Sequence, residues 1–161
     1  MKKSIIIETS LSEIAFLLVF VILITNIIIL KKQIVDFNLP GEILFDTGKA
    51  ELKENAKTEL VKISNEIKAI LEEESSYQNW EIRIEGHTDN RPISTNRYES
   101  NWELSSARAI SVVRFFVNNN IFKPDNLQAM GYGETKPMEL NNTPENMQKN
   151  RRVEIKFIRR H

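Results

Sequence analysis

The sequence predicts an α+β domain, a mixed sheet with two helices on one face, preceded by one apolar helix long enough to cross a membrane. Three features of the sequence carry this prediction. A nearly unbroken apolar run fills residues 14–30, two longer segments repeat apolar residues at helical spacing, and several short segments alternate apolar and polar residues. Together they give the element order β-α-β-α-β-β after the apolar helix.

The bulk composition excludes several classes of protein. The 161 residues include 22 Lys+Arg and 22 Asp+Glu, so the formal net charge is zero, which argues against a nucleic-acid partner. Without cysteine there is no disulfide scaffold, no thiolate metal site and no thiol for a lipid anchor. His87 and His161 are too few for most histidine-based metal centres, and we expect no metal and no resident cofactor.

The apolar run reads IAFLLVFVILITNIIIL over residues 14–30 and is interrupted only by Thr25 and Asn26. Seventeen helical residues at about 1.5 Å each reach roughly 26 Å, the low end for a membrane crossing. A cleaved signal peptide is the alternative, but small residues would then follow, whereas this sequence continues Lys-Lys-Gln-Ile-Val. We therefore expect an uncleaved transmembrane helix over residues 10–30, with residues 1–9 on one side of the membrane.

The remainder is predicted to be a connector followed by one domain. Residues 31–41 end in Pro-Gly and are expected to form a short linker, and residues 42–161 the domain. The apolar residues 43–45 are expected to be its first strand. The other expected elements are a helix over 52–73, a strand over 80–85, a polar loop over 87–102, a helix over 104–119, a strand over 127–131, a loop rich in glycine and proline, and a strand over 152–157.

A catalytic role finds little support in the motifs. His87 and Asp89 stand two apart in Gly-His-Thr-Asp, a spacing that would place both on one face of a strand as an acid–base pair. Alternatively, they shape the end of the strand through hydrogen bonds. No phosphate loop, nucleophile motif or third metal ligand accompanies them, and we expect the chain not to be an enzyme.

The polar loop offers a better candidate site, for binding. It combines charged, amide and aromatic side chains within about twenty residues, a mixture that suits a zwitterionic or sugar-like ligand. The alternative is a solvated loop ahead of a capped helix. The residues concerned are Asp89, Asn90, Arg91, Asn96, Arg97, Tyr98, Asn101, Trp102 and Arg108.

Four segments in order strengthen the binding interpretation: IEGHTDN at 84–90, NWELSSARA at 101–109, GYGETKP at 131–137 and NRRVEI at 150–155. Together they closely resemble the OmpA-like (OmpA/MotB C-terminal) peptidoglycan-binding domain over about residues 42–158. By that resemblance, Asp89 and Arg108 match the family's two contacts to the diaminopimelate residue of the stem peptide. The free end of that residue carries an ammonium and a carboxylate, so it needs one acidic and one basic partner. The resemblance also assigns four further pocket residues: Thr88, Asn101, Leu104 and Arg152.

The layout of one N-terminal helix plus this domain resembles the B subunits of ion-driven rotary motors, such as flagellar stators and the Zorya anti-phage motor. The resemblance implies a single-pass protein of the bacterial inner membrane, with a cytoplasmic N-terminus and a periplasmic C-terminal domain. It also implies a homodimer within a ring of multi-span A subunits. Its transported ion would be H⁺ or Na⁺, between which the sequence does not choose.

Glu13, which directly precedes the apolar run, matches the family's ion-carrying carboxylate. The alternative is a helix cap, because Ser10-Leu11-Ser12-Glu13 reads as a capping box, and the two roles are compatible. Flagellar members have Asp at this position, a preceding Tyr or Trp, and a longer linker with a plug helix. These departures favour a compact defence-type or other stator-like motor. They also leave open a passive tether or scaffold without ion transport.

Overall fold

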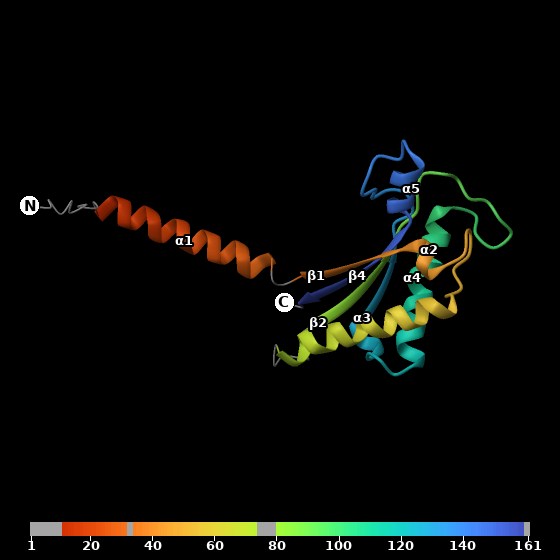
Figure 1. Ribbon diagram of the computed structural model, residues 1–161, viewed down its shortest axis with the longest axis horizontal. Helices are drawn as coiled ribbons and strands as arrows, with labels where there is room; N and C mark the ends of the chain where they lie inside the picture. The colour runs from red at the N-terminus through yellow and green to blue at the C-terminus, as the bar shows by residue number, and fades with distance from the viewer. Residues whose placement is uncertain (1–10, 32–33, 74–79, 160–161) are drawn as a thin grey trace, which may run out of the picture. The chain divides into compact units, whose positions relative to one another are not determined.

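The computed structural model describes residues 11–31, 34–73 and 80–159, which belong to two compact units, Met1–Ile34 and Val35–His161. The described part holds five α-helices, a short 3-10 helix and four strands (Figure 1). Their bounds are α1 Leu11–Lys31, β1 Ile34–Pro40, α2 Gly41–Leu44, α3 Glu54–Glu73, β2 Trp80–Gly86, α4 Asn101–Asn118, η1 Pro124–Asn126, β3 Leu127–Gly131, α5 Pro144–Asn150 and β4 Arg152–Arg159.

The first unit contains α1, whose apolar side chains from Ile14 to Ile24 are exposed. The Thr25 hydroxyl donates within the helix to two carbonyls one turn back, each at 2.9 Å, and Glu13 stands in the first turn. Across the described ranges, no helix meets the length and apolarity that a membrane crossing requires, so the expected transmembrane segment is not confirmed. The predicted cap Ser10 and the predicted cytoplasmic residues 1–9 lie outside the described residues.

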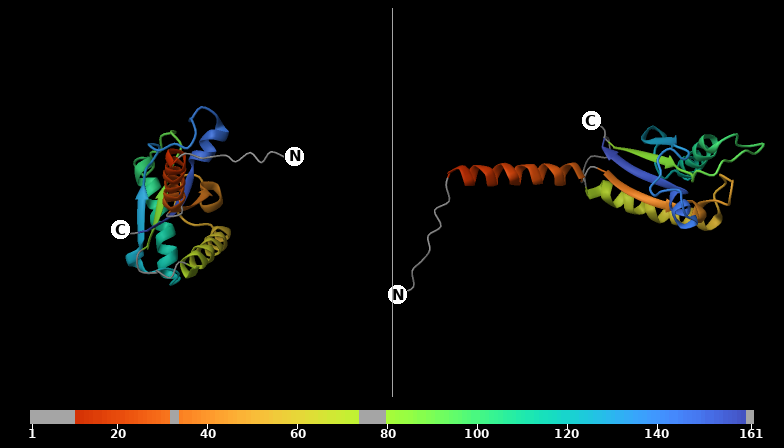
Figure 2. Two further views of the ribbon diagram at one scale, coloured as in Figure 1. Left: turned by 90° about the vertical axis from the view of Figure 1, so that its left-hand side faces the viewer. Right: turned by 90° about the horizontal axis from the view of Figure 1, so that it is seen from above.

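The second unit is built on a four-stranded sheet in the order β1-β4-β2-β3. Strand β2 runs parallel to β3, with Gly86 opposite Gly131, and antiparallel to β4, with Gly86 opposite Val153. The right-hand view of Figure 2 shows β4 between β2 and β1. The predicted mixed sheet is therefore confirmed, as are the strands that end near residues 86, 131 and 159.

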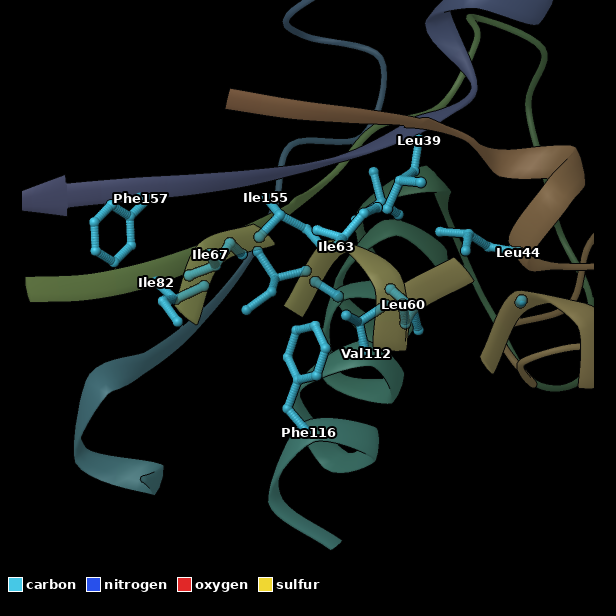
Figure 3. Close-up of a cluster of buried hydrophobic side chains, with 14 of the residues drawn as sticks. Leu39, Leu44, Leu60, Ile63, Ile67, Ile82, Val112, Phe116, Ile155 and Phe157 are labelled. Atoms are coloured by element: carbon cyan, nitrogen blue, oxygen red, sulfur yellow. The ribbon is translucent and has the colours of Figure 1, made fainter. Parts of the chain in front are cut away.

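Helices α3 and α4 both pack on one face of this sheet, as the sequence predicts (Figures 1 and 3). Their apolar residues recur at 3–4 spacing and meet the alternating residues of β2 and β4 in a single core. The Trp80 and Phe157 rings stack across the two strands, with centroids 4.1 Å apart. The core residues from these four elements are Ala56, Leu60, Ile63, Ile67, Leu71, Trp80, Ile82, Ile84, Ala109, Val112, Phe116, Val153, Ile155 and Phe157.

The start of the domain differs from the prediction. Of residues 43–45, expected as a strand, Ile43 and Leu44 belong to the helical turn α2, and Phe45 makes only an isolated bridge to Leu52. The first strand is instead β1, which occupies most of the connector expected over residues 31–41. Its Leu39 is buried and Phe37 half-buried in the core, whereas the intervening Asn38 is exposed, so a strand pattern was present there. Pro40 then breaks the strand and caps α2.

The loop expected between β3 and β4 contains a helix, α5, that the sequence analysis did not predict. The Thr143 side chain caps it by accepting a hydrogen bond from the Asn146 backbone. At its end the fully buried Asn150 accepts from the backbone nitrogens of Met138 and Glu139, at 2.8 and 3.0 Å. These bonds fix the segment that leads into β4.

Two glycines let α4 approach the ends of the strands. A Cβ at Gly86 would clash with the Ser105 carbonyl oxygen, and one at Gly131 would clash with the Ser106 hydroxyl. The carboxyl ends of β2 and β3 are therefore held directly against the first turns of α4. This contact places the residues that follow β2 beside those of α4.

Candidate functional site

A cavity of about 470 Å³ lies where the segment after β2 meets α2, α4 and the start of β4. Five of the six predicted pocket residues line it: Thr88, Asp89, Asn101, Leu104 and Arg108. The further lining residues used below are Glu42, Phe45, Asp46, Arg91 and Arg151. The sixth prediction, Arg152, is not among the lining residues, and Glu13 belongs to the other unit.

Asp89 supplies the acidic group of the cavity and is 4% exposed. Its Oδ2 accepts from Nε and NH2 of Arg91, at 3.0 and 2.7 Å, and from NH1 of Arg151 at 2.7 Å. Its Oδ1 accepts from the Arg91 backbone nitrogen at 3.1 Å. Burial raises the pKa of this carboxyl, but the hydrogen bonds from Arg91 and Arg151 outweigh burial and hold the pKa below its ordinary value. Asp89 is therefore a carboxylate at neutral pH.

Arg108 supplies a basic group from the side of α4 and is 5% exposed. Its Nε donates to the Lys49 carbonyl at 2.9 Å, and its guanidinium lies 5.2 Å from the centroid of the Phe45 ring. Burial lowers its pKa to about 10, so it is still charged at neutral pH. Among the described residues, no carboxylate lies within ion-pair distance of Arg108. A buried cation without a carboxylate partner is costly, and an anionic ligand would offset that cost.

Three further predicted residues shape the cavity. Thr88 is 4% exposed, and its hydroxyl has no hydrogen-bond partner within the part of the chain that the structure describes. The Asn101 side chain donates to the carbonyls of Arg91 and Asp89, at 2.9 and 3.4 Å, which holds the loop against α4. Leu104 packs in a small apolar group beneath that loop. The orphaned hydroxyl of Thr88 is a second feature that a polar ligand would satisfy.

Of the two adjacent arginines at the start of β4, the one that lines the cavity is not the one assigned to the pocket by the resemblance. Arg151 lines the cavity and bridges Asp89 to Glu42, with its NH2 2.6 Å from Glu42 Oε1. Arg152 is 6% exposed and donates from Nε to Glu154 Oε1 at 2.6 Å. Within the Asn-Arg-Arg segment that the resemblance matched, it is Arg151, just before β4, that lines the cavity, and the binding role of Arg152 stays a prediction. Glu42 had no signal in the sequence, whereas Arg91 belonged to the predicted polar set.

His87 does not line the cavity and makes no pair with Asp89. It is 1% exposed, stacks on Tyr132 with ring centroids 5.3 Å apart, and its Nε2 lies 3.9 Å from Glu85 and 3.7 Å from Glu154. Burial, with a contribution from the charge of Arg152, lowers its pKa to about 4, so the ring is neutral at pH 7.

The same region contains a possible metal-ligand set, because ligand atoms of Glu85, His87 and Glu154 lie within 4.8 Å of one another. Both carboxylates already have cationic partners, since Lys156 lies 2.8 Å from each of them and Arg152 pairs with Glu154. A divalent cation would therefore have to compete with Lys156 and Arg152 for these carboxylates. We call these groups the ionic cluster; its members are Glu85, His87, Arg152, Glu154 and Lys156.

Comparison with known proteins places this geometry among relatives. A family model described as the OmpA family matches residues 44–151. Motility protein B of Bacillus subtilis (strain 168) is 38% identical over 122 residues, 76% of this chain and 44% of that protein. The chain spans less than half the length of the curated relatives that it matches.

Two solved structures share the fold. The periplasmic domain of Helicobacter pylori MotB is 27% identical with a TM-score of 0.68, covering 79% of this chain and 77% of that one. The cell wall anchor of the T6SS from Pseudomonas aeruginosa is 27% identical with a TM-score of 0.63, covering 81% and 91%.

Proposed function

The chain belongs to the OmpA family, and from that premise we propose that its cavity binds peptidoglycan through the free amino-acid end of a stem-peptide diaminopimelate. The observation that supports the proposal best is Arg108, a buried guanidinium that has no carboxylate partner in the described part of the chain. It shares the cavity with Asp89 and with the orphaned hydroxyl of Thr88.

A zwitterionic ligand satisfies these groups together. Its carboxylate would pair with Arg108 and accept from Thr88, and its ammonium would pair with Asp89. The ionisable lining groups are three acids and three arginines, so the cavity carries no net charge that would reject a zwitterion. A volume of about 470 Å³ is in the range of small-ligand sites and suits one amino-acid-sized end group.

The test is retention on purified peptidoglycan sacculi. Arg108→Ala and Asp89→Asn each remove a charged hydrogen-bond partner, and we expect each to weaken binding about tenfold or more. Arg114→Ala is the matched control, because Arg114 is an exposed arginine of the same helix outside the cavity. Circular dichroism would show that the variants fold. Full retention of folded Arg108→Ala and Asp89→Asn would disprove the site.

For the whole protein we propose a stator-type B subunit of the inner membrane. In this proposal α1 is inserted in the bilayer, the domain is periplasmic, and a homodimer works within a ring of multi-span A-type subunits. Two observations support it: the similarity to motility protein B, and the exposed apolar side chains along α1, which need a cover that water does not provide. The protein should therefore remain with the membrane fraction after a carbonate wash, and release into the wash would contradict the anchor.

Glu13 is proposed to carry the transported H⁺ or Na⁺. Glu13→Gln should abolish ion-dependent activity in cells that also make the A-type partner, without changing retention on sacculi. Glu13→Asp is the control, because it keeps the carboxylate and should retain part of the activity. Full activity of Glu13→Gln would leave only the capping role.

A passive tether is the second candidate, favoured by the likeness to the T6SS cell wall anchor. In this role the cavity would still bind peptidoglycan, but Glu13 would transport nothing. The two candidates therefore share the Arg108 and Asp89 results and differ in the Glu13→Gln result alone.

A further inference from the structure

The acceptor atoms of Asp89 are largely occupied in this structure. Oδ2 receives three hydrogen bonds, two from the Arg91 side chain and one from Arg151, although a carboxylate oxygen has two lone pairs. Oδ1 accepts a hydrogen bond from the Arg91 backbone nitrogen. A ligand ammonium that approaches Asp89 therefore has to replace a guanidinium.

The two guanidiniums are not held equally. Arg151 is 23% exposed in its side chain and is also bound by Glu42, and its carbonyl accepts from the Gly41 nitrogen at 2.7 Å. The Arg91 side chain is 62% exposed, and its contacts in the described structure are all with Asp89. The Arg91 side chain is mostly exposed and has water as an alternative partner, whereas Arg151 is less exposed and also held by Glu42, so Arg91 is the guanidinium that leaves more readily.

The backbone of Arg91 can stay in place when its side chain moves. Its carbonyl accepts from Asn101 at 2.9 Å, and Asn101 is buried in the first turn of α4. The side chain extends from this fixed point into solvent on one side and to Asp89 on the other. Rotation of the side chain alone would therefore free Oδ2 of Asp89 without disturbing the loop.

We propose that Arg91 is a specificity-determining residue, a built-in cation that occupies Asp89 until a ligand ammonium replaces it. The inference rests on the proposed function, since it assumes that the amino-acid end of peptidoglycan enters this cavity. A ligand with only a carboxylate can bind Arg108 but gains nothing at Asp89. Arg91 thus lowers the affinity for every ammonium ligand, so that a cation without a carboxylate for Arg108 binds too weakly to stay in the cavity. It does not weaken a ligand that carries only a carboxylate.

The test compares two ligands by titration calorimetry with the full-length chain in detergent. Diaminopimelate carries amino and carboxyl groups, and pimelate has the same seven-carbon dicarboxylate chain without the amino groups. Arg91→Ala removes the competitor, and we expect it to bind diaminopimelate about three- to fivefold more tightly at low salt, the strength of an exposed ion pair. Pimelate binding should stay the same or weaken, because Arg91 also contributes positive charge.

Arg97→Ala is the matched control. Arg97 is an exposed arginine of the same loop that pairs with Glu51 and does not line the cavity. It should bind both ligands as the unchanged protein does. Weaker binding of diaminopimelate by Arg91→Ala would make Arg91 a direct ligand contact, and an equal change for both ligands would make its effect a general one; either result overturns the proposal.

Failure of the proposed function gives a different pattern. If the unchanged protein binds neither sacculi nor diaminopimelate, both the proposed function and the role of Arg91 are overturned. If it binds them, and Asp89→Asn loses diaminopimelate while Arg91→Ala does not gain affinity, only the competing role of Arg91 is overturned.

Discussion

The cavity and the ionic cluster are two groups of charges built around the same strand end, yet they are compensated differently. In the ionic cluster, Glu85 and Glu154 share Lys156, and the cationic partners Lys156 and Arg152 are both on β4. In the cavity, Asp89 is paired partly by an exposed loop residue, and Arg108 has no carboxylate partner in the described structure. The difference teaches that buried charges are available to a ligand where a partner of opposite charge is missing or can be displaced.

The largest effect is expected from disrupting the close approach of β2 to α4, on which both regions depend. Gly86→Ala places a Cβ against the Ser105 carbonyl, which forces β2 away from α4. We expect a loss of about 3 kcal/mol in the free energy of unfolding, measured by urea denaturation, together with weaker sacculus binding. Gly41→Ala is a graded control, because its Cβ would meet the Arg151 carbonyl at 2.9 Å and needs a smaller shift. Equal stability of the Gly86→Ala protein would show that the close approach is not required.

The second test addresses the ionic cluster through pH. The pKa of His87 is about 4 in the folded protein against an ordinary 6.5, so between these values the unfolded chain binds a proton that the folded chain excludes. The free energy of unfolding should therefore fall as the pH drops from 6.5 to 4, by up to about 3 kcal/mol. Urea midpoints across this window would measure the fall.

His87→Gln should flatten that pH dependence, whereas His161→Gln, which changes the other histidine of the chain, should leave it intact. Glu and Asp side chains away from the ionic cluster titrate alike in both variants, so the difference between the two curves reports on His87 and the carboxylates beside it. An unchanged slope in His87→Gln would contradict the burial of a neutral ring.

The third test separates the two regions. Glu154→Gln removes a mostly buried carboxylate that pairs with both Arg152 and Lys156. We expect the free energy of unfolding to fall by about 2 kcal/mol and sacculus binding to stay unchanged. Arg91→Ala removes an exposed side chain, and Asp89 keeps its hydrogen bond from Arg151, so the loss of stability should be under about 1 kcal/mol. Urea denaturation and sacculus binding would be measured on both variants. Weaker sacculus binding by a stably folded Glu154→Gln protein would contradict the distinction between the ionic cluster and the cavity.

Much of the fold could be predicted because the apolar pattern repeats over long segments. Helices α3 and α4 and strands β2, β3 and β4 lie within three residues of their predicted bounds, and all but the short β3 carry a repeated apolar pattern. The pattern failed where segments are short. Residues 43–45 are apolar enough for a strand, but Pro40 starts a helical turn there, and α5 is a mostly polar helix held by Thr143 and Asn150.

The candidate site was predictable where motifs fix the positions of residues along the chain. It was less predictable where membership of the cavity depends on which of two neighbouring side chains faces it. Asp89, Arg108 and Thr88 reach one cavity as the motifs indicate. The choice between Arg151 and Arg152 depends on where β4 begins, which a sequence of two identical residues does not reveal. Glu42 enters the cavity through its position on α2, a helical turn that the apolar pattern did not indicate, since it predicted a strand from residue 43.

Strand β1 also decides how the domain would bear a mechanical load. The strand starts at Ile34, where the chain arrives from the first unit, and it ends beside Gly41, which lines the cavity and donates to Arg151. A pull between the N-terminal segment and a ligand held in the cavity would run along β1. Sheet hydrogen bonds lie across the strands, so such a force would shear the β1–β4 bonds together instead of opening them one at a time. The order of the strands thus suits a domain that is fixed at one end and pulled from the other.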